Sequence, residues 1–246
     1  MAFTTLKDLG IDSPYKKEKY DNYINNQWVK PVDGKYFENI TPISGNPFCE
    51  VARSNEKDIN LALDAGHAAK DAWGKTSATE RANILLKIAD RMEQNLETIS
   101  LAETVDNGKP IRECMAADIP LAIDHFRYFA SAIRAQEGSI GEIDHESMAY
   151  HFHEPLGVVG QIIPWNFPIL MAVWKLAPAL AAGNRVMIKP SELTPHSSEL
   201  LDKMIRWAFP DGEVTVHLGD QQVGETFSSL PFDHLLFTGS TGIGRK

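Results

Sequence analysis

The segment GVVGQIIPWNFPILMAVWKLAPALAAGNRVMIK, residues 157–189, carries the clearest information about the fold. Its first seven residues form a short apolar run, the pattern of a parallel strand that is buried on both faces. The loop PWNFP follows, then a helical stretch that ends at Gly183, and the run RVMIK predicts a second strand. This order of strand, helix and strand indicates a parallel sheet with a crossover helix.

The sequence after residue 189 continues the alternation. PSELTP predicts the start of another helix, with Thr194 as N-cap and Pro195 at the first helical position. EVTVHL predicts a third strand, DQQVGETFSSL a short helix and HLLF a fourth strand. The expected fold class is therefore α/β, a doubly wound parallel (Rossmann-like) sheet, in which ligands lie at the carboxyl ends of the strands.

The part before residue 157 is expected to be mostly helical behind a short β-rich entry. YINNQWVKPVDGKYFENI has the turn signals of a hairpin. A helix is expected from Glu56, and Ser77 and Glu80 predict a capping box in front of the next helix. NGKP, residues 107–110, interrupts the helical pattern before a further helix, and residues 138–157 alternate like extended, partly exposed strands.

Composition excludes several classes of function. The 246 residues carry a net charge of −9 and no basic stripe, which argues against a nucleic-acid partner. The N-terminus lacks the apolar region of a secretory signal. The most apolar stretch, residues 168–183, is interrupted by Lys175 and is too short to span a membrane. Two cysteines, Cys49 and Cys114, suit a reducing compartment, so a cytoplasmic location is expected.

Two stretches have the chemistry of a nucleotide site. The ending FDHLLFTGSTGIGRK reads as a strand entering a small-residue turn, where Ser240 and the glycines let an anion approach the backbone. The spacing Gly239-x-x-Gly242-x-Gly244 is not the dinucleotide fingerprint, and an ordinary strand-to-helix turn would look similar. After the second strand, Glu192 could accept ribose hydroxyls and repel a 2′-phosphate, favouring NAD over NADP; the alternative is a solvated loop.

Asn166 has the chemistry of an oxyanion donor, although an ordinary turn asparagine is the alternative. Phe167, Met171 and Trp174 share one helical face, typical of either core or a substrate pocket.

His151 and His153 alternate in HFHEP, but no carboxylate or cysteine stands at ligand spacing, so no metal is expected. Neither Cys49 nor Cys114 has an adjacent histidine to activate a thiolate, and both are expected to be inert.

Taken together, GVVGQIIPWNFPILMAVWKLAPALAAGNRVMIKPSELTP, NGKP and FTGSTGIGRK closely resemble the aldehyde dehydrogenase superfamily, over nearly the whole chain from about Tyr23. The resemblance implies NAD(P)-dependent oxidation of an aldehyde to a carboxylic acid, with NAD as cofactor and NADP as a second possibility. It also implies a homo-oligomer, a dimer or tetramer.

The resemblance implies a role for particular positions. Asn166 matches the oxyanion donor, and Lys175 matches a buried lysine beside the active site. The remaining positions fall into two groups. Cofactor contacts are implied for Ile163, Pro164, Trp165, Lys189, Ser191, Glu192, Gly239, Ser240, Thr241, Gly242, Ile243 and Gly244, and aldehyde contacts for Phe167, Met171 and Trp174.

The resemblance also implies a division of the chain. Residues 1–137 would be the N-terminal helical part of the cofactor-binding domain, 138–157 the first strands of an oligomerisation arm, and 158–246 the Rossmann-like part. The family's glutamate base and nucleophilic cysteine would follow after residue 246, and neither Cys49 nor Cys114 matches the nucleophile.

We therefore expect a truncated chain that is inactive alone. The alternative is a non-catalytic module that binds NAD or pairs with other subunits. The part to about Asn184 is similar to the acetaldehyde-type branch and the remainder to the coniferyl-aldehyde branch, which leaves the preferred aldehyde open.

Overall fold

A six-stranded sheet forms the centre of the protein in the computed structural model, which describes residues 17–25, 27–195, 205, 214–216, 219 and 221–245. The strand order is β11-β8-β9-β10-β2-β3. The strands are β2 (Asn22–Ile24), β3 (Gln27–Val29), β8 (Val158–Ile162), β9 (Arg185–Lys189), β10 (Val214–Val216) and β11 (His234–Phe237). Strands β8 to β11 pair in parallel, which confirms the predicted fold class.

The two central strands are buried along their length. All five residues of β9 are buried, as are the first four of β8, because helices cover both faces of the sheet. The predicted hairpin is also present: β2 and β3 pair in an antiparallel manner and add to the sheet beside β10. The position of this hairpin beside β10 was not predicted, because sequence patterns do not reveal which distant strand a hairpin will join.

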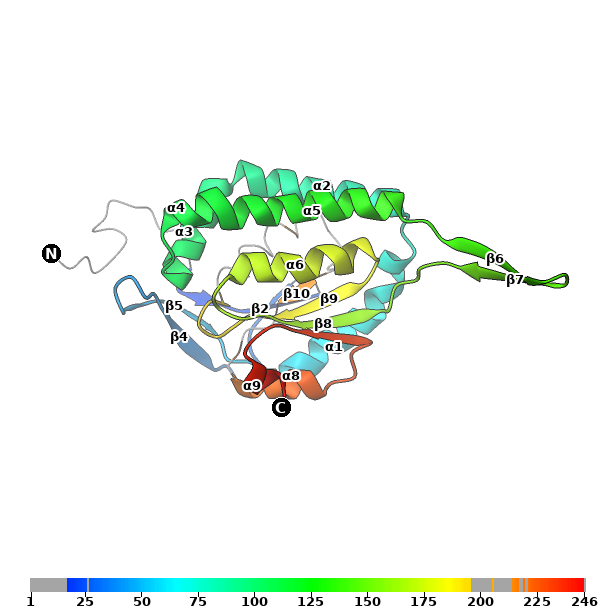
Figure 1. Ribbon diagram of the computed structural model, residues 1–246. Helices are drawn as coiled ribbons and strands as arrows, with labels where there is room; N and C mark the ends of the chain where they lie inside the picture. The colour runs from blue at the N-terminus through cyan, green and yellow to red at the C-terminus, as the bar shows by residue number, and fades with distance from the viewer. Residues whose placement is uncertain are drawn as a thin grey trace.

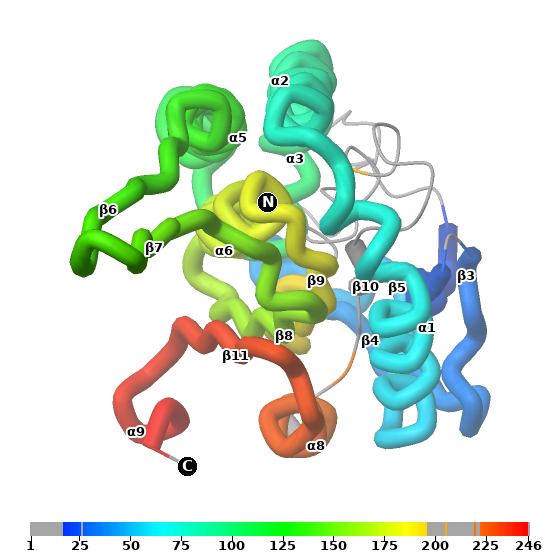
Figure 2. The backbone as a smooth tube through the Cα atoms, turned by 90° about the vertical axis from the view of Figure 1, so that its right-hand side faces the viewer, coloured from blue at the N-terminus to red at the C-terminus, as the bar shows by residue number. Residues whose placement is uncertain are grey.

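Helices form layers on the two faces of the sheet. Helix α6 (Pro168–Ala181) covers one face, while α1 (Glu56–Gly74) and α8 (Gln221–Ser229) cover the other (Figures 1 and 2). The core under α1 and α8 includes Ile59, Met187 and the fully buried Phe227. A larger core lies on the α6 side, and the sheet is therefore sealed from solvent on both faces.

A second helical layer covers α6. It consists of α2 (Ala78–Gln94), α3 (Leu96–Asn107), α4 (Ile111–Glu113), the short π-helix η2 (Cys114–Asp118) and α5 (Ile119–Ala135). Helices α2 and α5 pack along each other, and Figure 2 shows α6 between this pair and the sheet. The predicted capping box is confirmed, because Ser77 accepts from the Glu80 amide and Glu80 accepts from the Ser77 amide. Gly108 ends α3 in the left-handed conformation, with φ of 82°.

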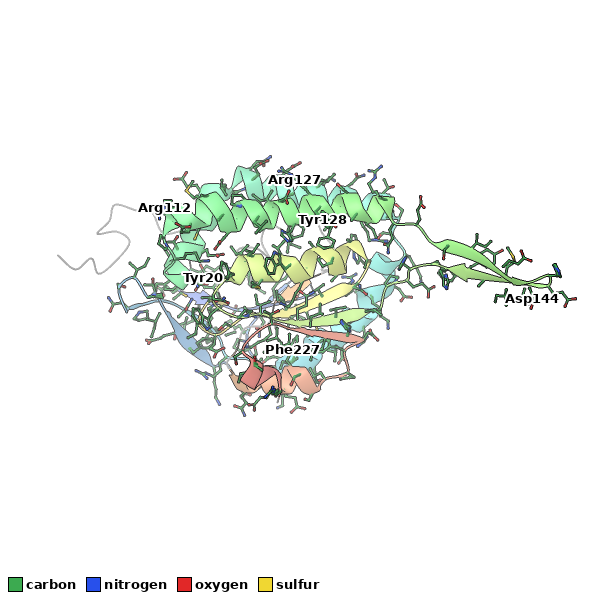
Figure 3. The ribbon with its side chains drawn as sticks, in the orientation of Figure 1. Tyr20, Arg112, Arg127, Tyr128, Asp144 and Phe227 are labelled. Carbon is green, nitrogen blue, oxygen red and sulfur yellow. The ribbon has the colours of Figure 1, made fainter. Side chains whose placement is uncertain are left out.

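Two smaller sheets complete the fold. Strands β1 (Lys19–Tyr20), β5 (Pro47–Ala52) and β4 (Tyr36–Ile40) form one of them. Strands β6 (Ser139–Asp144) and β7 (Ser147–His151) form a hairpin that projects away from the body, as Figure 1 shows, with Asp144 near its far end in Figure 3. The extended strands predicted within residues 138–157 are therefore confirmed.

Pro195 and Ile205 are helical, and the other residues of the helix predicted from Pro195 lie outside the described residues. The predicted elements EVTVHL, DQQVGETFSSL and HLLF appear as β10, α8 and β11. A short last helix, α9 (Thr241–Gly244), follows β11. Among the described helices, none combines the length and the apolar character that crossing a membrane requires.

Candidate cofactor site

A pocket of about 570 Å³ opens at the carboxyl ends of β8, β9 and β11. These three strands are parallel, so the residues that follow them meet at one edge of the sheet, where doubly wound folds bind their ligands. The pocket is lined by Ile162, Ile163, Pro164, Trp165, Lys189, Ser191, Glu192, Gly224, Glu225, Ser228, Leu235, Phe237, Thr238, Gly239, Ser240, Ile243 and Gly244. Ten of the twelve cofactor positions implied by the sequence resemblance lie in this lining, and Thr241 and Gly242 do not.

An ion pair stands where β9 ends. Lys189 is buried, and its Nζ lies 3.5 Å from Oε2 of the half-buried Glu192. Between them, the Ser191 hydroxyl accepts a hydrogen bond from the Leu193 amide at 3.2 Å, which fixes the turn. The pair offers a donor and an acceptor side by side, an arrangement suited to the two vicinal hydroxyls of a ribose.

The turn after β11 forms another part of the wall. Ser240 is the N-cap of α9, and its Oγ accepts from the Ile243 amide at 3.3 Å. Gly239 lets the Phe237 ring approach the turn closely, because a Cβ at this position would lie 2.5 Å from Cζ of that ring and would displace it. The phenyl ring therefore packs directly under the turn and holds it against the strand.

Helix α8 supplies the wall that sequence analysis missed. Gly224, Glu225 and Ser228 line the pocket, and a Cβ on Gly224 would lie 3.9 Å from Nζ of Lys189. The short helix DQQVGETFSSL was predicted, but its pattern gave no sign of which face would meet β9. A helix that connects two parallel strands lies against the sheet, and this general rule is the signal that could have pointed to α8.

Asn166 and Lys175 lie on either side of the start of α6. Asn166 is exposed in the loop 164–167 between β8 and α6, and its side chain makes no hydrogen bond with any other described residue. Lys175 is buried, and its Nζ donates to Oγ1 of Thr238 at 2.6 Å. Burial lowers the pKa of Lys175 to about 8. Because Thr238 also lines the pocket, Lys175 connects α6 to the cofactor side of the sheet.

The three predicted aldehyde contacts lie apart from this pocket. Phe167 and Met171 are half-buried and pack against the core beside α6, and none of the three is in the pocket lining. Trp174 is 42% exposed, and its ring centroid lies 5.7 Å from that of His125 on α5. The structure thus separates the pocket at the strand ends from these aromatic side chains of α6 and the loop before it.

The comparisons with known proteins agree with this architecture. The family model named "Aldehyde dehydrogenase family" matches residues 28–246. This chain belongs to the aldehyde dehydrogenase family. Acetaldehyde dehydrogenase 2 of Cupriavidus necator is 58% identical over 247 residues, which cover 100% of this chain and 49% of that protein.

Two further relatives are similar to this chain, one compared by sequence and one by structure. Aldehyde dehydrogenase B of Escherichia coli K12 is 61% identical over 232 residues, covering 94% of this chain and 45% of that protein. The NAD⁺ complex structure of the Bacillus cereus aldehyde dehydrogenase is 35% identical with a TM-score of 0.89, covering 93% of this chain and 48% of that one. The chain spans about half the length of the relatives that it matches.

Neither of the two cysteines forms a disulfide, and both are buried. Burial raises the pKa of the Cys114 thiol to about 11, and its Sγ lies 3.6 Å from Oγ1 of Thr104. A thiol with this pKa is protonated at neutral pH, and only the thiolate is nucleophilic.

A buried polar cluster lies beside Cys114. Among the described residues, Glu103, Cys114 and Asp118 are close enough to share a metal ion. Asp118 is instead ion-paired with Lys109, whose ammonium group supplies the positive charge in this cluster. His151 ends strand β7 of the projecting hairpin and His153 follows it, and both are exposed. Nδ1 of His151 lies 2.7 Å from Oγ of Ser139.

Proposed function

We propose that this chain is the cofactor-binding part of an NAD-dependent aldehyde dehydrogenase that oxidises an aldehyde to a carboxylic acid. The observation that carries the proposal is the pocket at the carboxyl ends of β8, β9 and β11, with the Lys189–Glu192 pair on one side and the Ser240 turn on the other. The Bacillus cereus relative, 35% identical, has a structure described as an NAD⁺ complex. NAD, when bound, supplies the acceptor for the hydride that leaves the substrate.

The pocket residues then have distinct roles. Lys189 and Glu192 hold the hydroxyls of the adenosine ribose, and the turn from Gly239 to Gly244 receives the pyrophosphate through Ser240 and its neighbouring amides. Trp165, with Ile163 and Pro164, forms the wall toward α6. The Glu192 carboxylate would repel a 2′-phosphate, so NAD is preferred over NADP.

The reacting aldehyde lies on the α6 side. The uncommitted amide of Asn166 donates to the oxyanion that forms when the carbonyl carbon is attacked. Phe167, Met171 and Trp174 contact the apolar part of the aldehyde. Lys175 holds Thr238, and through it the adjoining cofactor turn, in place.

We further propose that the 246-residue chain does not turn over an aldehyde by itself. These 246 residues contain two cysteines, and both are buried, with the Cys114 thiol protonated at neutral pH. Turnover by the purified chain with NAD and an aldehyde such as acetaldehyde would contradict this statement.

The projecting hairpin supports a role in subunit contacts. Its side chains are almost all exposed, and Ile140, Ile143, Met148 and Tyr150 are between 52% and 69% exposed. Exposed apolar side chains on a two-stranded arm favour packing against another subunit. We therefore propose a homo-oligomer, with residues 138–157 as the arm between the helical part, 1–137, and the Rossmann-like part, 158–246. Buried cysteines that form no disulfide fit a reducing compartment, and we propose a cytoplasmic location.

The test is a fluorescence titration of the purified chain with NADH. The proposal predicts saturable binding at one site per chain. Glu192→Gln should weaken NADH binding about tenfold, because a hydrogen bond to a charged group is lost. The same variant should also reduce the preference of the chain for NADH over NADPH. Glu146→Gln, on the exposed hairpin, serves as the control and should leave the affinity unchanged. An absence of NADH binding up to millimolar concentration would refute the proposed function.

A further inference from the structure

Within the loop that carries Asn166, Trp165 and Asn166 are held by little packing of their own. It joins β8 to α6, and its Trp165 is 54% exposed while Asn166 is also exposed. Burial therefore does not determine where these two residues stand, between the pocket and α6. Something outside the loop has to hold it.

Three side chains from one distant segment contact the backbone and ring on both sides of Asn166. The Asn107 side-chain amide donates to the carbonyl oxygen of Trp165 at 2.6 Å. The ammonium of Lys109 lies 3.8 Å from the centroid of the Phe167 ring. The anchors thus fall on the residue before Asn166 and on the residue after it.

The third contact lies at the start of α6. The carboxylate oxygen Oε2 of Glu103 accepts from the Ile169 amide at 3.3 Å, an amide in the first turn that has no partner within the helix. Glu103 itself is fully buried, so it holds this end of α6 from the core side.

The anchoring segment is itself rigid. Glu103 and Asn107 belong to α3, and the left-handed Gly108 turns the chain so that Asn107 and Lys109 both reach the loop. Lys109 is ion-paired with the buried Asp118 at the end of η2, and the side chains of the pair are only 16% and 7% exposed. A cation held in this way cannot leave the Phe167 ring without breaking a buried ion pair.

We propose that Asn107 and Lys109 are positioning residues for the 164–167 loop, which set the places of Trp165 in the cofactor pocket and of Asn166 at the reacting carbonyl. The role assigned to the loop rests on the proposed function, whereas the anchoring does not. A donor that is displaced by about an ångström loses most of its effect on a reaction, so anchors of this kind affect function without touching the ligand.

The test is hydrogen–deuterium exchange on the 246-residue chain, read at the amides of residues 165–167, 169 and 170. Asn107→Asp replaces the donor by an acceptor that faces the Trp165 carbonyl. We expect exchange in this segment to become about tenfold faster, with the urea midpoint of global unfolding unchanged and the NADH dissociation constant raised about fivefold. A merely structural role would instead shift the urea midpoint.

The matched control is Asn95→Asp. Asn95 donates its side-chain amide to the Arg91 carbonyl at 2.8 Å, the same chemistry at the end of α2, and this variant should change neither loop exchange nor NADH affinity. A second pair tests the cation: Lys109→Met should loosen the loop, and Lys109→Arg should restore it, because the charge over Phe167 is kept.

The outcomes separate the two proposals. Unchanged loop exchange in Asn107→Asp, or equal effects of Asn107→Asp and Asn95→Asp, would overturn the positioning role. Faster exchange confined to the loop supports that role even in a chain that fails to bind NADH, in which case the proposed function alone is refuted.

Discussion

Replacing Glu103 by glutamine should remove a large pH dependence of stability. Burial, reinforced by Asp118 and Asp106 and opposed by Lys109, raises the pKa of Glu103 from its ordinary value of 4.5 to about 8. One carboxylate oxygen, Oε1, has no hydrogen-bond partner among the described residues, which fits a protonated carboxyl. The folded protein therefore holds this proton more tightly than the unfolded chain does.

The sign follows from proton linkage. The stabilisation is complete below the unfolded pKa and is lost as the pH rises through the folded pKa, so the free energy of unfolding falls between about pH 4.5 and pH 8. Within this window, the free energy of unfolding falls by about 1.4 kcal/mol for each pH unit, and by less close to the folded pKa. From pH 6 to pH 8 the wild-type chain should lose about 2 kcal/mol from this one group, whereas Glu103→Gln should lose nothing from it.

The assay is urea unfolding at pH 6, 7 and 8 for the wild-type chain and the variant. Groups distant from Glu103 contribute equally to both proteins, so the difference between the two curves reports Glu103 together with the charged groups that interact with it. Glu97→Gln, an exposed glutamate on the same helix, should run parallel to the wild type. If the free energy of unfolding depended on pH in the same way for the wild type and Glu103→Gln, the raised pKa of Glu103 would be refuted.

Three further predictions concern stability. Ile88→Ala removes a fully buried side chain between α2 and α5 and should lower the free energy of unfolding by about 2–5 kcal/mol in urea. Ser77→Ala removes the cap of α2, including the bond to the Glu80 amide, and should cost about 1 kcal/mol in the same assay. The lowered pKa of Lys175, about 8, means that the free energy of unfolding rises with pH above 8. Lys175→Met, which also loses the Thr238 bond, should flatten that rise by about 2 kcal/mol between pH 8 and 10.

Local patterns in the sequence predicted much of the fold. The apolar run before PWNFP and the run RVMIK could be recognised as strands because a strand buried on both faces has no polar alternation. The Ser77–Glu80 capping box was recognised because both of its hydrogen bonds are made within four residues. Such features depend on neighbours in the chain, and a single sequence contains them.

The contacts that shape the site could not be predicted in the same way. Asn107 and Trp165 are separated by 58 residues, and nothing in NGKP indicates which loop its side chains will reach. The same holds for Gly224 of α8 beside Lys189. These contacts arise from how helices pack on the sheet, and packing depends on the shapes of surfaces formed by residues far apart in sequence.

The cofactor positions were assigned from a family resemblance rather than from the residues alone. The strands deliver them to one edge because parallel strands end on the same side of a sheet, and this topology could be predicted. Which side chain of that edge meets which part of a ligand remains a prediction, with Thr241 and Gly242 outside the pocket lining.

The most direct test of the central claim is a crystal structure of this chain grown with NAD⁺. We expect the dinucleotide in the pocket at the ends of β8, β9 and β11. Its adenosine ribose should contact Lys189 and Glu192, and its pyrophosphate should lie at the Ser240 turn. Two results would contradict this assignment: NAD⁺ bound at another place in the protein, or a pocket that stays empty in crystals grown at a saturating concentration of NAD⁺.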